Sequence, residues 1–262
     1  MKWSKVNAIV TGGASGLGFA VVEKILAGGG QVAMADIELA IKKPVSMVNN
    51  NRCISVVMDV TNEDSVKQGV TRTCKQFGSI NLLVNCAGIL HSEKMVGFDS
   101  ELSSDDFSHV LNVNLTGTFR VCREVARVMQ ENESEITVNA NDNNEEKGLI
   151  INTASIAVYE GQIGQVAYSA SKGGVASMTL PMARELARHH IRVMTIAPGM
   201  FETAMLENIP DEARNNLIEQ SLFPHRMGRP DEFAQLVQHI VENPMLNGSV
   251  IRLDGGLRMP AK

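Results

Sequence analysis

The sequence predicts an α/β fold, a doubly wound parallel sheet of about seven strands with helices on both faces. Short apolar runs of strand length alternate with longer amphipathic stretches along most of the chain. Runs such as 191–196 are more continuously apolar than alternating, which is typical of strands buried on both faces. A chain of 262 residues, 44% of them hydrophobic, can bury a full core, so we expect residues 1–262 to form one domain.

The expected elements follow this rhythm in order. Strands are predicted in the apolar runs at residues 6–11, 31–35, 54–58, 80–84, 148–153, 191–196 and 249–253. Long amphipathic helices are predicted near residues 16–28, 63–77, 104–131 and 164–189. Helix-length stretches between successive strands favour right-handed crossovers and a parallel sheet.

Two segments depart from the rhythm. Residues 131–147 are acidic, rich in Asn and almost without large apolar side chains, so we predict an exposed, mobile loop, with a partner-binding loop as the alternative. Residues 200–229 mix apolar side chains at helix-like spacing with few glycines, which favours an amphipathic lid over the substrate.

A glycine-rich loop, Thr11-Gly-Gly-Ala-Ser-Gly-Leu-Gly18, joins the first expected strand to the first expected helix. Gly12, Gly16 and Gly18 would let backbone N–H groups approach a pyrophosphate at the positive helix N-terminus. This position is typical of a Rossmann-type dinucleotide site. The spacing is G-x3-G-x-G in place of G-x-G-x-x-G, and a tight turn is the alternative interpretation.

Asp36 closes the second expected strand and indicates which dinucleotide binds. A carboxylate at this point can accept hydrogen bonds from both hydroxyls of the adenosine ribose, and it repels a 2'-phosphate. No arginine occurs from Gly12 to Lys42 to balance such a phosphate. The sequence therefore favours NAD over NADP, with a plain turn residue as the alternative role of Asp36.

Tyr168 and Lys172 stand four residues apart at the start of the helix expected at 164–189, so they share one face. A free tyrosine ionises near pH ~10, and an ammonium beside it favours the phenolate. The pair is therefore a candidate acid/base, with Ser155 thirteen residues upstream of Tyr168. The other tyrosine, Tyr159, has Ile163 four residues on and serves as an internal control.

Composition excludes several classes of function. A net charge of −5 without a basic block gives no footprint for direct nucleic-acid binding, and no apolar run has the length of a membrane span. The six histidines lack metal-ligand spacing, so no metal is predicted. The cysteines are scattered, which suits a reducing compartment. We expect a cytoplasmic protein, with the mitochondrial matrix as the alternative.

Taken together, the motifs resemble the short-chain dehydrogenase/reductase family over essentially the whole chain. The match comprises the glycine loop, Asp59-Val60, Asn85-Cys-Ala-Gly88, Asn114-Leu-Thr-Gly117, Ser155 with Tyr168-x3-Lys172, and Pro198-Gly199 followed by Thr203. Within the family, long runs look like the subgroup of type 2 3-hydroxyacyl-CoA dehydrogenases, also called type 10 17β-hydroxysteroid dehydrogenases: 10–18, 151–155, 160–162, 167–174, 192–199 and 250–255.

The resemblance implies a role for each matching residue. Tyr168 would be the base in alcohol oxidation, Ser155 would hold the reacting oxygen, Lys172 would bind the nicotinamide ribose, and Asn114 would hold a water of the proton path. The implied cofactor contacts are Gly12, Ser15, Gly16, Leu17, Gly18, Asp36, Asp59, Val60, Cys86, Ala87, Gly88, Tyr168, Lys172, Pro198, Gly199, Phe201 and Thr203. Gln162 is a candidate substrate contact beside Ser155 and Tyr168, with a helix-start cap or a solvent-facing residue as the alternatives.

The implied activity is NAD-dependent interconversion of a secondary alcohol and a ketone in lipid metabolism, on a 3-hydroxyacyl-CoA or a hydroxysteroid. An NADPH-dependent 3-oxoacyl reductase is the first alternative. A dehydrogenase with a further, protein-mediated role in an RNA-processing complex is the second. The family also implies a homotetramer in which the helices at 104–131 and 164–189 pair across a two-fold axis.

Overall fold

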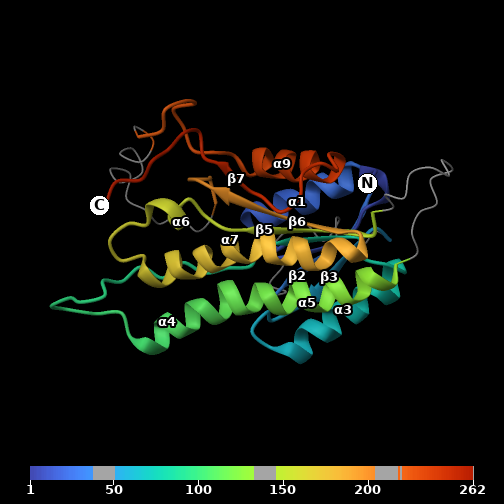
Figure 1. Cartoon of the computed structure of the whole chain (residues 1–262), viewed down its shortest axis with the longest axis horizontal. Helices are drawn as coiled ribbons and strands as arrows, with labels where there is room; N and C mark the ends of the chain where they lie inside the picture. The colour runs from blue at the N-terminus through green and yellow to red at the C-terminus, as the bar shows by residue number, and fades with distance from the viewer. Residues whose placement is uncertain (38–50, 133–145, 204–217, 219, 262) are drawn as a thin grey trace.

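A parallel sheet of seven strands runs through the middle of the molecule (Figure 1). The structure is a computed structural model that describes residues 1–37, 51–132, 146–203, 218 and 220–261. The strand order is β3-β2-β1-β4-β5-β6-β7, and every neighbouring pair is parallel. The strands are β1 Asn7–Thr11, β2 Gln31–Asp36, β3 Cys53–Val57, β4 Leu82–Asn85, β5 Gly148–Thr153, β6 Ile191–Pro198 and β7 Val250–Leu253. The predicted fold class is confirmed, with strand ends shifted by a few residues.

Helices cover both faces of the sheet, so most strands are buried on both sides. One face carries α1 (Gly16–Ala27) and α9 (Pro230–Glu242), which pack against each other above β1. The other face carries α3 (Glu63–Phe77), α5 (Thr118–Glu131) and α7 (Val166–Leu186). Burial on both faces explains the continuous apolar runs of the central strands. Short 3-10 turns stand at Trp3–Lys5 (η1) and Ala187–His189 (η3).

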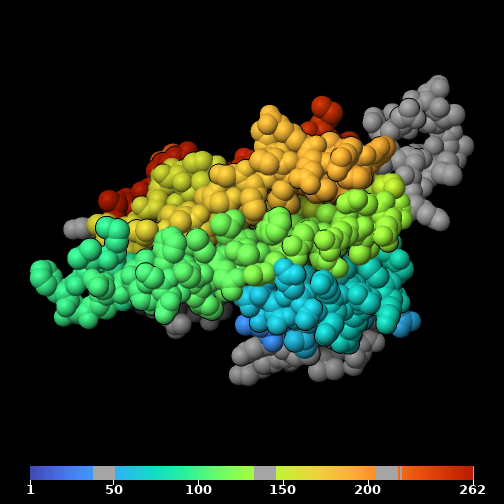
Figure 2. Space-filling view, turned by 60° about the horizontal axis from the view of Figure 1, so that its bottom comes forward, coloured from blue at the N-terminus to red at the C-terminus, as the bar shows by residue number. Residues whose placement is uncertain are grey.

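The helix expected at 104–131 is a continuous helical rod made of three pieces. α4 (Ser104–Leu111) begins with the side chain of Ser103 accepting from the backbone N–H of Asp106 at 3.0 Å. A π-helical stretch, η2 (Asn112–Gly117), follows and leads directly into α5. Figure 2 shows α4 and α5 lying beside α7 on one face of the molecule. A π-helix inserts an extra residue per turn and re-aims the side chains it carries, among which is Asn114.

α9 was not expected from the sequence, and a buried arginine explains how it is held. Arg192 on β6 donates to the carbonyl oxygens of four residues at the end of α9 and just after it: Ile240, Val241, Asn243 and Leu246. Its Nε atom also lies 2.7 Å from Oε1 of Glu146. A cation at a helix C-terminus is favourable because the last carbonyl groups lack partners within the helix.

Most of the predicted acidic loop and lid lies outside the described residues, namely 133–145, 204–217 and 219. Of the acidic loop, Glu146 is described, and it is ion-paired with Arg192 instead of being freely solvated. Of the lid, residues 200–203, 218 and 220–229 are described. Within the described part of the chain, no helix is long and apolar enough to cross a bilayer.

Candidate active site

A cavity of about 710 Å³ opens at the carboxyl ends of the strands. The strand order reverses between β1 and β4, and the loops that follow these two strands both line the cavity. Such a reversal point is where ligands bind in open α/β sheets. Every site residue named from the sequence lines the cavity except Asn114.

The glycine loop forms one end of the cavity. Gly12 has a φ of +62°, and a Cβ atom there would stand 2.8 Å from the backbone nitrogen of Ala87. A Cβ atom on Gly18 would stand 2.3 Å from the carbonyl oxygen of Gly12. Ser15, the N-cap of α1, makes no side-chain capping bond, so the first N–H groups of the helix are not taken up by its hydroxyl. Such groups can bind a pyrophosphate.

Asp36 lines the cavity, and two hydrogen bonds fix its carboxylate where a ribose could bind. Its Oδ2 atom accepts a hydrogen bond from the N–H of Ala14 at 3.2 Å, and Oδ1 accepts from Ile37 at 2.8 Å. The carboxylate therefore lies against the glycine loop. Asp59 makes a similar local turn, with Oδ1 accepting from the N–H of Thr61 at 2.8 Å, and Val60 follows it on the cavity wall.

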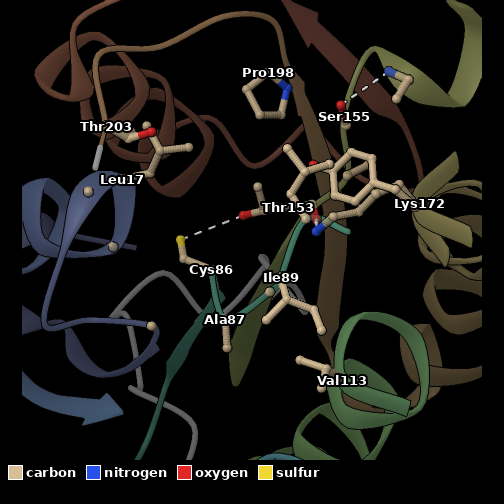
Figure 3. A pocket seen from close by; sticks show the side chains of 18 of the residues that line it. Leu17, Cys86, Ala87, Ile89, Val113, Thr153, Ser155, Lys172, Pro198 and Thr203 are labelled. Atoms are coloured by element: carbon tan, nitrogen blue, oxygen red, sulfur yellow. Dashed lines mark hydrogen bonds between the residues drawn. The ribbon is translucent and has the colours of Figure 1, made fainter. Parts of the chain in front are cut away.

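A row of hydrogen bonds joins the ends of three neighbouring strands beneath the cavity. Thr11 donates to Asn85 at 3.3 Å, and Asn85 donates to Oδ1 of Asn152 at 2.9 Å. Above this row, Figure 3 shows the hydroxyl of Thr153 directed at the sulfur of Cys86, at 3.6 Å. Burial raises the pKa of the Cys86 thiol to about 11, so it is a neutral thiol at physiological pH.

Asn114 does not line the cavity. Its side chain is buried and makes hydrogen bonds to the loop after β4 and to α7. The amide nitrogen donates to the carbonyl oxygen of Ile89 at 2.9 Å and to Oγ of Ser171 at 3.0 Å, and Oδ1 accepts from the N–H of Ile89 at 2.8 Å. The backbone carbonyl oxygen of Asn114 accepts a hydrogen bond from the hydroxyl of Thr118 at 2.7 Å. The side chain is fully buried and holds the loop after β4 against α7.

Ser155 and Lys172 lie at the other end of the cavity (Figure 3), and Tyr168, which is hydrogen-bonded to Ser155, lines the cavity with them. Lys172 is 5% exposed, its Nζ atom donates to the carbonyl oxygen of Thr153 at 2.9 Å, and burial lowers its pKa to about 8. Nζ lies 5.9 Å from the centre of the Tyr168 ring. Burial raises the pKa of the Tyr168 phenol, opposed by a hydrogen bond with Ser155.

This balance differs from the expected lowering of the tyrosine pKa by Lys172. The ammonium group is directed at Thr153, and burial of the phenol is the larger effect. The protonated phenol is the form that can donate a proton to a ketone. A positive charge close to the Tyr168 ring would lower the pKa of the phenol and so favour removal of its proton.

The segment after β6 closes the cavity between these two ends. Pro198 and Gly199 lead to Phe201, whose buried ring packs edge-on against Phe233 of α9 at 6.4 Å between centroids. Thr203 reaches the glycine loop, since a Cβ atom on Gly16 would stand 3.4 Å from its methyl group. Figure 3 shows Thr203 beside Leu17, across the cavity from Lys172.

Gln162 also lines the cavity, where it was predicted to contact substrate. Its side-chain nitrogen donates to the carbonyl oxygen of Pro260 at 3.3 Å, and its own N–H donates to Gln165 at 3.1 Å. The cavity is also lined by residues that the sequence did not indicate, among them Thr153, Gln165, Ile89, Val113 and Met259. Thr153 follows directly from the strand that ends before Ser155, whereas no local signal indicates Met259.

The residues present fit a dinucleotide. Glycines 12 and 18 leave no room for side chains where the loop and the helix start meet the cavity, and the N–H groups of the α1 start are free of the Ser15 hydroxyl. Asp36 supplies a carboxylate beyond them. This donor set offers N–H groups to phosphates and an acceptor to sugar hydroxyls.

A cluster of His91, Glu93 and Asp106 brings three ligand atoms within 4.8 Å of one another. His91 and Glu93 already pair at 3.2 Å, and Asp106 accepts from Ser103. The cluster adds nothing to the prediction of a metal-free site, which stays a prediction.

Comparison with known proteins identifies the family. The family model described as "short chain dehydrogenase" matches residues 6–214. The 3-hydroxyacyl-CoA dehydrogenase type-2 of Bos taurus is 46% identical over 254 residues, which cover 96% of this chain and 95% of that protein. The 3-oxoacyl-[acyl-carrier-protein] reductase FabG of Thermotoga maritima is 33% identical over 256 residues, 95% of this chain and 96% of the reductase.

Among solved structures, that of 3-hydroxyacyl-CoA dehydrogenase type-2 from Mycobacterium avium superposes with a TM-score of 0.89 at 38% identity. The match covers 97% of this chain and 96% of that one. The motif order, the parallel sheet and these similarities agree, and the chain belongs to the short-chain dehydrogenase family, in which it is an oxidoreductase close to the type 2 3-hydroxyacyl-CoA dehydrogenases.

Proposed function

We propose that the protein is an NAD-dependent dehydrogenase that interconverts a 3-hydroxyacyl-CoA and its 3-oxoacyl-CoA. The observation that carries the proposal is a single cavity with the Ser155, Tyr168 and Lys172 side chains at one end and the glycine loop with Asp36 at the other. The substrate class is supported by the 46% identity to the protein named 3-hydroxyacyl-CoA dehydrogenase type-2. A hydroxysteroid, which presents the same secondary alcohol, is the alternative substrate.

The site residues act on the alcohol oxygen and its proton. NAD, when bound, supplies carbon C4 of the nicotinamide as hydride acceptor. Ser155 donates a hydrogen bond that holds the substrate oxygen beside the phenol, and Tyr168 takes its proton. Lys172 is the cation that the chain itself places near the phenol, and it can bind the nicotinamide ribose. In the reverse direction Tyr168, protonated as its raised pKa favours, donates to the ketone oxygen.

Asn114 acts in this scheme as a positioning residue. Its amide fixes Ile89 and Ser171, and the Ser171 hydroxyl donates to the carbonyl oxygen of Tyr168 at 2.7 Å. The proposed water of the proton path would bind the Asn114 carbonyl oxygen through the lone pair that Thr118 does not use. The compartment and a further role in an RNA-processing complex stay predictions.

A panel of steady-state assays tests the proposal. The protein is given NAD⁺ or NADP⁺ at equal concentration with 3-hydroxybutyryl-CoA, a branched 3-hydroxyacyl-CoA and a hydroxysteroid. We expect the highest kcat/KM for NAD⁺ with an acyl-CoA. Equal or better turnover with NADP⁺ would establish the alternative of an NADPH-dependent reductase, and turnover of the steroid alone would overturn the substrate assignment.

Replacing the proposed base tests the chemistry. Tyr168→Phe removes only the hydroxyl, so we expect kcat to fall by about 10²- to 10⁴-fold, the usual contribution of a positioned acid/base. NADH affinity, measured by fluorescence titration, should stay within about twofold, less than 1 kcal/mol. Tyr159→Phe is the matched control because Tyr159 is 51% exposed and does not line the cavity. A Tyr168→Phe variant with near wild-type kcat would show that Tyr168 is not the acid/base of the reaction.

Removing the charge of Asp36 tests cofactor selection. Asp36→Asn keeps an oxygen that can accept from Ala14 but no longer repels a 2'-phosphate, so kcat/KM for NADP⁺ relative to NAD⁺ should rise by about tenfold or more, about 1.4 kcal/mol. Asp64→Asn, an exposed acid in the first turn of α3, is the control. An unchanged cofactor ratio would show that Asp36 does not select NAD.

We expect Lys172 to lower the free energy of unfolding of the protein, because its ammonium group is buried in the site. Burial depresses its pKa to about 8, so its charged form is penalised in the folded state. The penalty, about 3 kcal/mol, is full below about pH 8 and fades as pH rises toward the ordinary lysine pKa of about 10.4. Lys172→Met should therefore raise the free energy of unfolding at neutral pH by about 2 kcal/mol, after loss of the bond to Thr153.

Denaturant unfolding at two pH values measures this effect. The gain from Lys172→Met should shrink at high pH, where the wild-type amine is neutral when folded. Lys67→Met, on an exposed face of α3, should change stability by less than about 0.5 kcal/mol at either pH. A Lys172→Met protein that is less stable than wild type at neutral pH would contradict the account.

We also propose that the protein is a homotetramer in which two copies pair across a two-fold axis through the face formed by α4, α5 and α7 (Figure 2). Phe119 on α5 and Leu180 on α7 are 43% and 45% exposed, although both are large and apolar. Light scattering during size-exclusion chromatography should give four times the chain mass of 28.4 kDa. Phe119→Asp with Leu180→Asp should give smaller species, and a wild-type monomer at micromolar concentration would refute the proposal.

A further inference from the structure

The C-terminal segment, residues 257–261, ends beside the loop before α7 (Figure 1), where Gln162 and Met259 both line the cavity. The carbonyl oxygen of Pro260 accepts from the Gln162 side chain at 3.3 Å, and that of Ala261 accepts from the N–H of Ile163 at 3.0 Å. Between these contacts and β7, Met259 lines the cavity. A part of the chain nearly one hundred residues from Gln162 thus completes the wall that Gln162 begins.

An ion-pair network fixes this segment to the loop before α7. Arg252 on β7 makes a two-pronged contact with Glu160, at 2.8 and 3.0 Å, and its Nε atom lies 2.7 Å from Asp254. The same guanidinium donates to the carbonyl oxygen of Leu257 at 3.1 Å. Side-chain exposures of 23% for Arg252, 19% for Glu160 and 9% for Asp254 make this a largely shielded network. Planar, two-pronged pairs of this kind fix geometry as well as contribute energy.

Two further contacts hold Met259 itself in place. The Glu160 carboxylate accepts a hydrogen bond from the backbone of Met259, and the neighbouring Leu257 is 1% exposed. The backbone on either side of Met259 is therefore tied down, and Met259 lines the cavity. This arrangement makes the segment a fixed wall whose one adjustable part is a methionine side chain.

The wall belongs to the substrate end of the cavity. Gln162, to which the segment is bonded, lies on the same short stretch as Ser155 and Tyr168, which act on the substrate oxygen. The adenine end, at Asp36 and Asp59, is formed by loops on the other side of β1. We therefore expect the side chain at position 259 to contact the part of the substrate beyond the reacting carbon, and not the dinucleotide.

We propose that Met259 is a specificity-determining residue that limits the size of the substrate's apolar group beyond the reacting carbon. The inference rests on the proposed function, since it takes the acyl chain as that group. A thioether side chain is apolar and adapts its shape, so it suits contact with an alkyl chain. Shortening the side chain enlarges this end of the cavity, and a rigid aromatic ring fills it.

The test measures how the chain-length profile changes in Met259→Ala and Met259→Trp. For each variant, kcat/KM is determined for reduction of acetoacetyl-CoA and of 3-oxooctanoyl-CoA with NADH, and the ratio of long to short substrate is compared with wild type. We expect the ratio to fall by about tenfold or more in Met259→Trp and to rise by about threefold or more in Met259→Ala, within the range that hydrophobic pockets give. NADH affinity should stay within about twofold in both.

Met245→Trp and Met245→Ala are the matched controls, because Met245 is 88% exposed and lies outside the cavity. A long-to-short ratio that both Met259 variants leave unchanged, in protein that melts as wild type does, overturns the inference while the proposed function stands. The inference is also overturned if the variants weaken NADH binding and leave the ratio unchanged.

The proposed function fails separately if wild type reduces neither acyl-CoA. In that case the same ratio is measured with short and long aliphatic methyl ketones. The inference is upheld on that substrate class if the two Met259 variants shift the ratio in opposite directions, and is overturned if they do not.

Discussion

The active site depends on one buried amide, the side chain of Asn114. Its three hydrogen bonds, at 2.8 to 3.0 Å, bind the backbone N–H and the carbonyl oxygen of Ile89 and the hydroxyl of Ser171. The loop after β4 and the start of α7 are thereby fixed to each other through η2. An unpaired amide in this fully buried position would be costly, so the arrangement is strongly specified. It also explains why residue 88 is glycine, since a Cβ atom there would stand 3.1 Å from Asn114 Oδ1 and 3.4 Å from Lys172 Nζ.

This constraint places two titratable groups where burial works against their charged forms. The pKa of Lys172 is lowered to about 8 and that of Tyr168 is raised, in each case chiefly by burial. Of the two, only Lys172 has a pKa near neutral pH, whereas the raised pKa of Tyr168 favours the protonated phenol, the form that would donate to a ketone in the proposed reaction. The cost falls on stability, and the dense packing of the sheet and its helices has to offset it.

Local sequence predicted the parts of the site that local geometry determines. The glycine loop and the Tyr168–Lys172 spacing are read from a few consecutive residues, because a strand-to-helix turn and one helical turn follow directly from them. The chain elements missed from sequence depend on long-range contacts. α9 needs Arg192 from β6 at its end, and Met259 reaches the cavity only because Arg252 ties the chain end to Glu160. The π-helix at Asn112–Gly117 was likewise not predicted, and it carries Asn114, whose side chain bonds to Ile89, 25 residues away in the chain.

Isotope transfer in a single turnover shows whether hydride passes directly from an acyl-CoA alcohol to NAD. The protein in excess is mixed with NAD⁺ and 3-hydroxybutyryl-CoA that carries deuterium on carbon 3, and the products are analysed by mass spectrometry and NMR. We expect NADH with the label at C4 of the nicotinamide and an equal amount of acetoacetyl-CoA, with no label in the solvent. NADH without label, or no NADH from this substrate while NADP⁺ is reduced in its place, would contradict the proposed function.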